Sequence, residues 1–152
     1  SGGAWQDARA EAADLAVKPP DVRLQGGDIN PKALKLARQN ARTAGVEGRI
    51  EFRELSVADF ESRDKYGCVV TNPPYGERMG ELSEAEAVYG DLGRLARKLE
   101  TWSLYAISAH SGFEKIFAAE SGRGGQVRRR KLYNGPIECT YFQYAGPRPP
   151  WG

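Results

Sequence analysis

Cysteine, histidine and long apolar runs are scarce in this sequence of 152 residues, and each scarcity excludes a class of protein. The two cysteines, Cys68 and Cys139, lie far apart in apolar segments, so they form neither a disulfide framework nor a metal-ligand pair. The single histidine, His110, excludes a metal site built from several histidines. We therefore expect no metal, and we expect structural roles for His110 and core positions for both cysteines.

Membrane and export signals are also missing from the sequence. No apolar run approaches the roughly 18 residues that a membrane-spanning helix needs. The first residues, Ser1 to Trp5, contain no basic stretch followed by an apolar one. The composition, with 40% hydrophobic and 28% charged residues, is typical of a globular domain. We expect a cytoplasmic protein with one domain over residues 1–152, in which a helical lead-in (1–20) precedes a core (21–147).

The net charge of +2 is distributed unevenly along the chain. From residue 121 onwards, six basic residues stand against one acidic residue, Glu138. A basic C-terminal segment favours a polyanionic partner such as a nucleic acid. The same charges would also suit a solvated edge strand that positive charge protects against aggregation. Charge alone leaves both interpretations open.

Segments of helical and strand character alternate along the chain, which predicts an α/β fold with a mostly parallel sheet. Asn30-Pro31 predicts a helix start, and the capping boxes Ser83–Glu86 and Ser111–Glu114 predict two more. Asn134-Gly135-Pro136 predicts the turn of a C-terminal antiparallel hairpin. The expected helices span residues 6–17, 31–44, 83–100 and 111–120, and the expected strands span 22–29, 49–55, 66–71, 102–109, 127–133 and 137–144.

The most informative motif, Asn72-Pro73-Pro74-Tyr75, follows an apolar strand directly. In an open parallel sheet, ligands bind beyond the carboxyl ends of the strands. The prolines fix two backbone dihedrals and remove two donors, so the Pro73 carbonyl and the Asn72 side chain become convergent acceptors. The Tyr75 ring supplies a stacking surface. This set fits an exocyclic amine on a planar base, because the acceptors can hold the amine hydrogens while the ring holds the base still.

The motif resembles the target-amine motif of class I S-adenosylmethionine-dependent amino-methyltransferases. The longer string Thr71 to Arg78 resembles the ribosomal RNA guanine-N2 methyltransferases that carry a THUMP domain. The resemblance covers residues 20–145 and extends through Gly26-Gly27-Asp28-Ile29-Asn30, Ala37-Arg38-Gln39-Asn40-Ala41, Thr101-Trp102 and Lys131-Leu132-Tyr133-Asn134-Gly135. It implies a Rossmann-like sheet, S-adenosylmethionine as cofactor, guanine N2 of 23S ribosomal RNA as target, and a catalytic role for residues 72–75.

Several polar positions correspond to cofactor contacts under this resemblance. Asp28 would accept the ribose hydroxyls, and Ile29 would pack on the adenine face. Asp59 would bind the adenine amino group. The other cofactor candidates in the sequence are Asn30, Ala58 and Asn72. Two alternatives stay open, because Asp28 could help to cap the following helix and Asp59 could be an ordinary turn residue.

The basic residues that the resemblance places near RNA are Arg78, Arg128, Arg130 and Lys131. Side chains alternate across a strand, so at most half of the run at 128–131 can face one partner. The solvated edge strand remains the alternative.

One segment of the family pattern is not found. The family begins its catalytic domain with a strand that ends in a Gly-rich, cofactor-binding loop, and nothing before Asp28 resembles it. We therefore expect a partial, N-terminally truncated catalytic domain that lacks the first strand of the sheet and is inactive by itself. Two other functions remain open: an N6-adenine methyltransferase acting on DNA or RNA, and a non-catalytic nucleic-acid-binding fragment.

Overall fold

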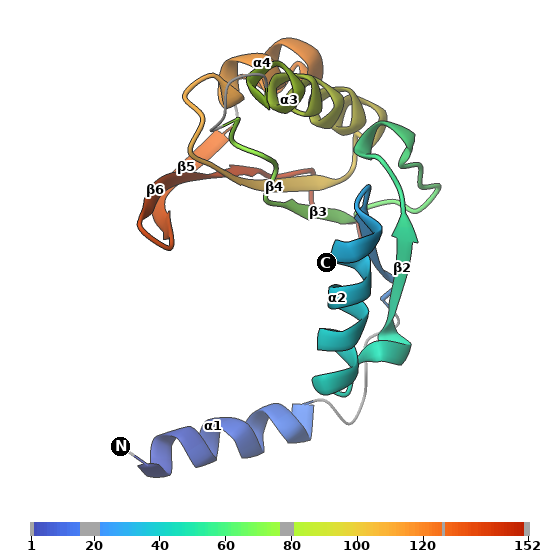
Figure 1. The fold of residues 1–152 in the computed structure, drawn as a ribbon, viewed down its shortest axis with the longest axis vertical. Coiled ribbons are helices and arrows are strands. Elements are labelled where there is room, and N and C mark those ends of the chain that lie inside the picture. Colours follow the sequence, from blue (N-terminus) through green and yellow to red (C-terminus); the bar gives the residue numbers. More distant parts are fainter. Residues whose placement is uncertain (1, 16–21, 77–80, 126, 151–152) are drawn as a thin grey trace. The chain divides into compact units, whose positions relative to one another are not determined.

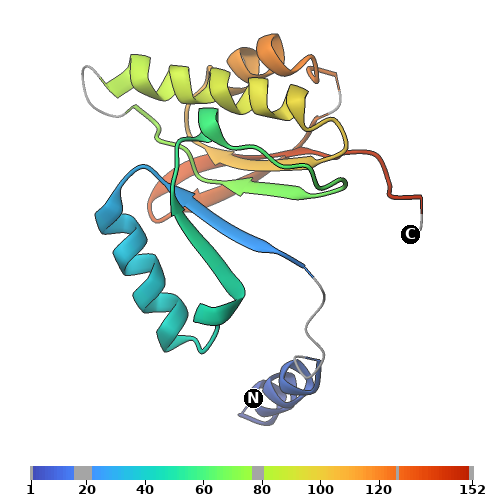
Figure 2. The same cartoon turned by 90° about the vertical axis from the view of Figure 1, so that its right-hand side faces the viewer.

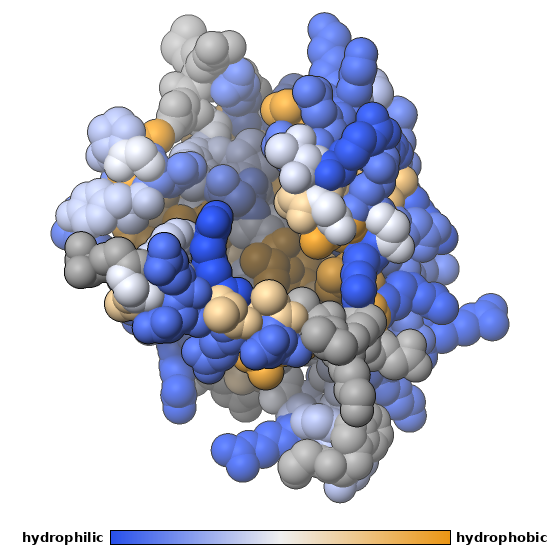
Figure 3. All heavy atoms as spheres, turned by 90° about the horizontal axis from the view of Figure 1, so that it is seen from below, coloured by the Kyte–Doolittle hydropathy of each residue, from blue (hydrophilic) through white to orange (hydrophobic). Residues whose placement is uncertain are grey.

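The structure, a computed structural model, describes residues 2–15, 22–76, 81–125 and 127–150. The chain divides into two units, Ser1–Glu54 and Leu55–Gly152, and each is described by itself. Both contain parallel strands, and the second ends in an antiparallel hairpin. The α/β class expected from the sequence is thus confirmed. Hydrophilic residues dominate the face shown in Figure 3, and hydrophobic side chains show between them.

The first unit is a strand-helix-strand arrangement preceded by a helix. Strands β1 and β2 pair in parallel, with Gly26 opposite Phe52. As predicted, Asn30 caps helix α2, because its Oδ1 atom accepts the Lys32 N–H at 2.9 Å. Gly45, with a φ of +71°, follows the end of this helix. The elements are α1 (Gly2–Leu15), β1 (Leu24–Asp28), α2 (Pro31–Thr43), η1 (Glu47–Arg49) and β2 (Ile50–Glu54) (Figure 1).

A close approach between the two strands explains one of the paired glycines in β1. A Cβ atom at Gly26 would lie 2.8 Å from the ring of Phe52, so a larger residue would displace that ring. Arg38 of α2 donates to the Phe52 carbonyl oxygen at 3.0 Å, and its guanidinium lies 5.8 Å from the ring centroid. The contacts of Phe52 therefore tie helix α2 to the strand pair.

The second unit is a four-stranded sheet with the order β3-β4-β6-β5. Strands β3 and β4 are parallel, whereas β6 is antiparallel to both β4 and β5. The second strand of the predicted hairpin is therefore the one that joins the sheet. Helices α3 and α4 cover one face of this sheet (Figures 1 and 2). The elements are η2 (Val57–Asp59), β3 (Cys68–Thr71), α3 (Glu81–Lys98), β4 (Ser103–Ser108), α4 (Phe113–Ser121), β5 (Val127–Asn134) and β6 (Ile137–Tyr144).

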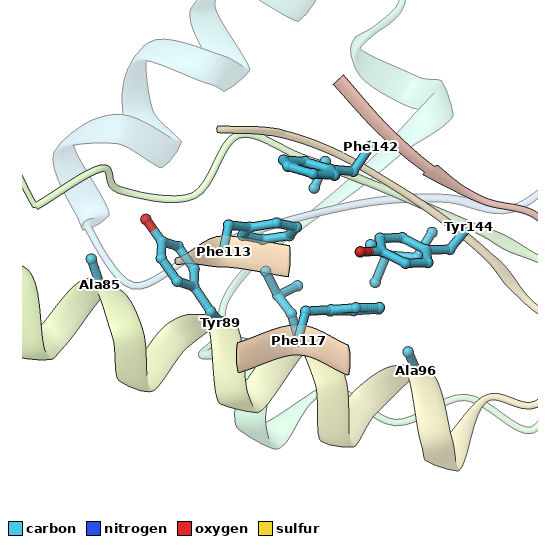
Figure 4. Packing of buried hydrophobic residues seen from close by; sticks show 10 residues of the cluster. Ala85, Tyr89, Ala96, Phe113, Phe117, Phe142 and Tyr144 are labelled. Carbon is cyan, nitrogen blue, oxygen red and sulfur yellow. The ribbon is translucent and has the colours of Figure 1, made fainter. Parts of the chain in front are cut away.

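An aromatic core lies between this sheet and its two helices (Figure 4). Phe113 is 5.0 Å from Tyr89 and 4.8 Å from Phe142, measured between ring centroids, and Phe117 is 4.3 Å from Tyr144. All five side chains are buried. Ring pairs at these separations are favourable beyond the area that they bury. The core therefore fixes α3 and α4 against strands β4 and β6.

Both capping-box predictions are wrong. Helix α3 begins at Glu81, so Ser83 lies inside its first turn. Helix α4 begins at Phe113, and its cap, Gly112, makes no side-chain cap bond. The loop before α4 is instead closed by His110, whose Nδ1 atom accepts the Gly112 N–H at 3.0 Å. The structural role expected for His110 is thus confirmed.

The core prediction is confirmed for Cys139 and wrong for Cys68. Cys139 is 2% exposed, whereas Cys68 is exposed on β3, an edge strand of its sheet. Val70 lies on the same side of β3, two residues on, and is 77% exposed. Val69, on the opposite side of β3, packs against the aromatic core, so within the second unit this apolar strand packs on one face.

Candidate active site

The Asn-Pro-Pro-Tyr loop follows Thr71, the last residue of β3. Asn72 and Pro74 are exposed, Pro73 is buried, and Tyr75 is half-buried. Gly76 turns the chain with a φ of +71°, and a Cβ atom there would lie 2.9 Å from the Leu82 backbone. The loop therefore leaves the carboxyl end of a parallel strand and turns at once, which is where ligands bind in open α/β sheets.

A hydrogen bond inside the motif joins its two polar side chains. The Tyr75 hydroxyl donates to Asn72 Oδ1 at 2.7 Å. The carbonyl oxygen of an amide has two lone pairs, so this bond uses one and leaves the other available. The Asn72 side chain is consequently held with its oxygen toward Tyr75, and it keeps one acceptor site for a ligand.

Two residues of the C-terminal hairpin reach the same tyrosine. Asn134 Nδ2 donates to the Tyr75 hydroxyl oxygen at 3.2 Å, and Cys139 Sγ lies 3.6 Å from that oxygen. Burial raises the pKa of the Tyr75 phenol, and the bond from Asn134 acts in the opposite direction. The phenol is therefore protonated near neutral pH and can donate to Asn72.

Tyr89 of α3 fastens the motif to the aromatic core. Its side chain is fully buried, and its hydroxyl donates to the Pro74 carbonyl oxygen at 2.5 Å. Burial raises the pKa of Tyr89, which keeps the hydroxyl a donor. Sequence reasoning missed this residue, because its spacing from Ala85 and Leu92 is that of an ordinary core position.

The first unit carries the expected ribose and adenine residues at the carboxyl end of β1. Asp28 is exposed, and its Oδ1 atom accepts the Asn30 N–H at 2.8 Å. The capping alternative for Asp28 is therefore real, but it uses one oxygen and leaves the second for a ligand. Ile29 is 71% exposed, as a residue that packs on a base must be. The Oδ1 atom of Asn30 is occupied by the helix cap.

The remaining cofactor candidates lie in the second unit: Asn72 in the loop after β3, and Ala58 and Asp59 in the short helix η2. Ala58 and Asp59 are both exposed there. Ser56 caps this turn by accepting the Ala58 N–H at 3.2 Å, and the Asp59 carboxylate takes no part in that cap. Exposed carboxylates and an exposed apolar side chain are the groups that an adenosine moiety needs. Taken unit by unit, the exposed side chains are thus of the chemical kinds that fit S-adenosylmethionine.

Ion pairs divide the basic run of β5 into two sets. Arg129 forms a two-pronged pair with Glu114 of α4, and Lys131 pairs with Glu138 at 2.7 Å. In the strand register Arg129 lies opposite the buried Phe142, so it shares the sheet face on which the helices pack. Lys131, two residues on, lies on that same face.

Arg128 and Arg130 lie on the other face of the sheet. They are opposite Gln143 and Tyr141 of β6, and both are exposed. Neither forms an ion pair within the described residues. The structure thus separates Arg128 and Arg130 from Lys131, which the sequence grouped with them. Arg78 lies outside the described residues.

Arg123 belongs to the structure of the fold, although it contributes to the basic C-terminal charge. It is half-buried and donates to the Trp102 carbonyl oxygen at 2.9 Å and to the Ala96 carbonyl oxygen at 2.8 Å. These bonds tie the end of α3 to the start of β4. Burial lowers the pKa of its guanidinium.

Within residues 2–15, 22–76, 81–125 and 127–150, no group of three or more His, Cys, Asp or Glu side chains could hold a metal. Over the same ranges, none of the helices combines the length and apolar character needed to cross a bilayer.

In this α/β unit, a parallel strand is followed directly by Asn-Pro-Pro-Tyr, and the asparagine is oriented as an acceptor. These features define the class as a Rossmann-like methyltransferase domain. The chain belongs to the RMKL-like methyltransferase domain family, which matches residues 3–143.

Relatives support this assignment. Ribosomal RNA large subunit methyltransferase K/L from Shewanella sp. (strain W3-18-1) is 35% identical over 144 residues, which cover 92% of this chain and 20% of that protein. A solved structure from Listeria monocytogenes, described as a predicted N6-adenine-specific DNA methylase, is 38% identical with a TM-score of 0.77 and covers 97% and 36% of the two chains.

A further solved structure bears on the cofactor. This candidate methyltransferase, complexed with SAH, is 30% identical with a TM-score of 0.77, and the match covers 94% of this chain and 37% of that one. SAH is what S-adenosylmethionine becomes after methyl transfer, so the expected cofactor is confirmed for the family. The chain spans between a fifth and about two fifths of the length of these relatives.

Proposed function

We propose that this chain carries the target-amine site of an enzyme that methylates an exocyclic base amine, guanine N2 of large-subunit ribosomal RNA. The observation that carries the proposal is the oriented acceptor: Asn72 Oδ1 is held by Tyr75 at the carboxyl end of β3 and keeps one free lone pair. Membership of a methyltransferase family agrees with this chemistry.

The proposed mechanism rests on positioning. Asn72 Oδ1 and the Pro73 carbonyl oxygen accept the two hydrogens of the amine, which draws its lone pair out of conjugation with the base. The Tyr75 ring stacks on the base and fixes the distance of attack. S-adenosylmethionine, when bound, supplies an electrophilic sulfonium methyl group. After transfer the amine releases one proton to water, and no side chain of the motif needs to act as a strong base.

The proposed cofactor contacts are assigned residue by residue within each unit. The Asp28 oxygen that is not bonded to Asn30 would accept the ribose hydroxyls, and Ile29 would pack on the adenine. Asp59 would accept the adenine amino group, with Ala58 beside it. The Asn30 Oδ1 atom is used in the helix cap and its backbone N–H is bonded to Asp28, so the proposed contact of Asn30 is its side-chain NH₂ group.

The proposed partner is 23S ribosomal RNA, in the cytoplasm. Arg128 and Arg130, exposed and without ion pairs, are the best phosphate contacts of the described residues. Lys131 would reach RNA only from the other face, and Arg78 keeps its proposed role from the sequence alone. The name of the Shewanella relative supports an RNA substrate. The Listeria relative, named for adenine N6, favours a second candidate target, because the same acceptors serve that amine.

The test is Asn72→Ala in the protein that contains this chain, expressed at full length. Methyl transfer to undermodified ribosomal RNA should fall by about 10²-fold or more, as for the loss of one preorganised hydrogen-bonding group. The affinity for S-adenosylmethionine should stay within a few fold. Asn72→Asp is the matched control, because it keeps an oxygen acceptor and should retain more activity than alanine. Full activity of the alanine variant would refute the role of Asn72.

The same assay identifies the base. Digestion of the methylated RNA to nucleosides separates N2-methylguanosine from N6-methyladenosine by mass spectrometry. Adenine methylation would replace the guanine assignment and keep the acceptor mechanism. Nucleic-acid binding without any transfer by the full-length protein would favour the non-catalytic alternative.

A further inference from the structure

We propose that Asn134, at the tip of the β5–β6 hairpin, is a positioning residue that acts on Asn72 through the Tyr75 hydroxyl. The inference deepens the proposed function and rests on the acceptor role of Asn72. It is carried by two consecutive hydrogen bonds, from Asn134 Nδ2 to the Tyr75 oxygen at 3.2 Å and from the Tyr75 hydroxyl to Asn72 Oδ1 at 2.7 Å.

These two bonds have only one possible direction. The amide nitrogen of Asn134 can donate and cannot accept, so its bond occupies a lone pair of the Tyr75 oxygen. The hydroxyl has a single hydrogen, which is then given to Asn72. Cys139 Sγ, 3.6 Å from the same oxygen, flanks the hydroxyl on the hairpin side. Asn134 therefore directs the Tyr75 hydrogen toward Asn72.

The direction matters for the chemistry because an amide has two different ends. With Oδ1 held by Tyr75, the Asn72 side chain offers an acceptor to the amine. A flip of that amide would turn its NH₂ group toward the amine, and two donors would then oppose each other. The bond from Asn134 to Tyr75 and the bond from Tyr75 to Asn72 thus exclude the orientation in which the NH₂ group of Asn72 faces the amine.

The hairpin is suited to this role because β6 joins it to the rest of the sheet, although β5, which carries Asn134, is the edge strand. Strand β6 pairs with β4 and with β5, and Asn134 lies opposite Ile137 across the Gly135-Pro136 turn. Gly135 has a φ of +60°, which the tight turn requires. Cys139, two residues beyond Ile137, is buried. The Asn134 side chain is therefore presented from a paired strand end, which fixes it better than a free loop would.

Kinetics of the full-length protein test the proposal. Asn134→Ala should lower kcat about tenfold, the size of one neutral hydrogen bond, and leave the Kd of S-adenosylmethionine unchanged. Asn134→Asp should be worse than alanine, because a carboxylate would accept the Tyr75 hydrogen and take it from Asn72. Glu138→Ala is the matched control in the hairpin: Glu138 is exposed and contacts Lys131, and its loss should leave kcat unchanged.

A double-mutant cycle separates positioning from hairpin stability. In a Tyr75→Phe background the hydroxyl is absent, so Asn134→Ala should cause no further loss of kcat. Losses that multiply in the double variant would show that Asn134 acts independently of Tyr75 and would overturn the proposal. Wild-type kcat for Asn134→Ala would overturn it as well.

Titration of the Tyr75 phenol gives a readout that does not depend on activity. The bond donated by Asn134 stabilises the phenolate, so Asn134→Ala should raise the pKa of Tyr75, followed by ¹³C NMR of labelled tyrosine. An unchanged pKa would overturn the relay even in an active enzyme. If the wild-type protein methylates no amine, the proposed function fails, and the titration still decides whether Asn134 is bonded to Tyr75.

Discussion

Removing positive charges from one face of β5 at a time tests which face of this strand binds RNA. The double variant Arg128→Gln/Arg130→Gln removes two cations that have no ion-pair partner within the described residues. The control Arg129→Gln/Lys131→Gln changes the net charge equally but on the opposite face, where both cations are already paired with carboxylates. Comparing the two variants separates the effect of where positive charge is removed from the effect of how much is removed.

The magnitude follows from counterion release. Each phosphate contact contributes about 0.7 to the slope of log K against log salt for single-stranded nucleic acid and about 0.9 for a duplex. Loss of two contacts should therefore flatten the slope by about 1.4–1.8. Between about 50 mM and about 200 mM salt, the Arg128/Arg130 variant should lose roughly 7- to 12-fold less affinity than wild type.

The assay is fluorescence anisotropy with a ribosomal RNA fragment over a salt series, after urea unfolding has shown that both variants are folded. The control should keep nearly the wild-type slope, because Arg129 is held by Glu114 and Lys131 faces away from Arg128 and Arg130. Equal flattening by both variants would show that only net charge matters. No flattening by either would leave β5 as a solvated edge strand.

Two further predictions concern stability. Arg123→Met should lower the free energy of unfolding by about 2–4 kcal/mol, because the charged donor to the Ala96 and Trp102 carbonyl oxygens is lost; an unchanged urea midpoint would contradict this. Arg129 holds the pKa of Glu114 below its ordinary value of 4.5, so the pair stabilises the fold above that value, and its contribution is lost as the pH falls through the lowered pKa. Urea midpoints of wild type should fall more steeply with acid than those of Glu114→Gln, and parallel curves would rule the pair out.

Local signals predicted most of the secondary structure. Asn30 and Gly45 bracket α2 because a cap and a left-handed turn residue act within a few residues of the helix end. The apolar run at Cys68–Thr71 became β3 with its predicted end. The capping boxes failed because α3 begins two residues before Ser83, and because Gly112, not Ser111, stands at the cap position of α4.

The candidate site likewise has one part that the sequence could predict and one part that it could not. Asn72 and Tyr75 are three residues apart, so the motif and its chemistry could be recognised from the sequence. Their supports could not, because Tyr89, Asn134 and Cys139 are brought to the motif by the packing of α3 and by the sheet order β3-β4-β6-β5. Asn134 belongs to a segment that the family resemblance includes, but its sequence context gave it no role other than in the turn.

The contacts of Tyr75 explain why a four-residue motif needs a whole domain. A hydroxyl can donate in several directions and an amide can flip, so Asn72 and Tyr75 alone would populate both acceptor and donor orientations toward a base. Tyr89 fixes the backbone at Pro74, and Asn134 selects the direction of the Tyr75 hydrogen. The motif supplies the polar atoms that contact the base. Residues 15 to 64 positions away in the chain determine which of these atoms act as acceptors and which act as donors. Substitution of Asn134 should therefore affect turnover although this residue makes no contact with the base.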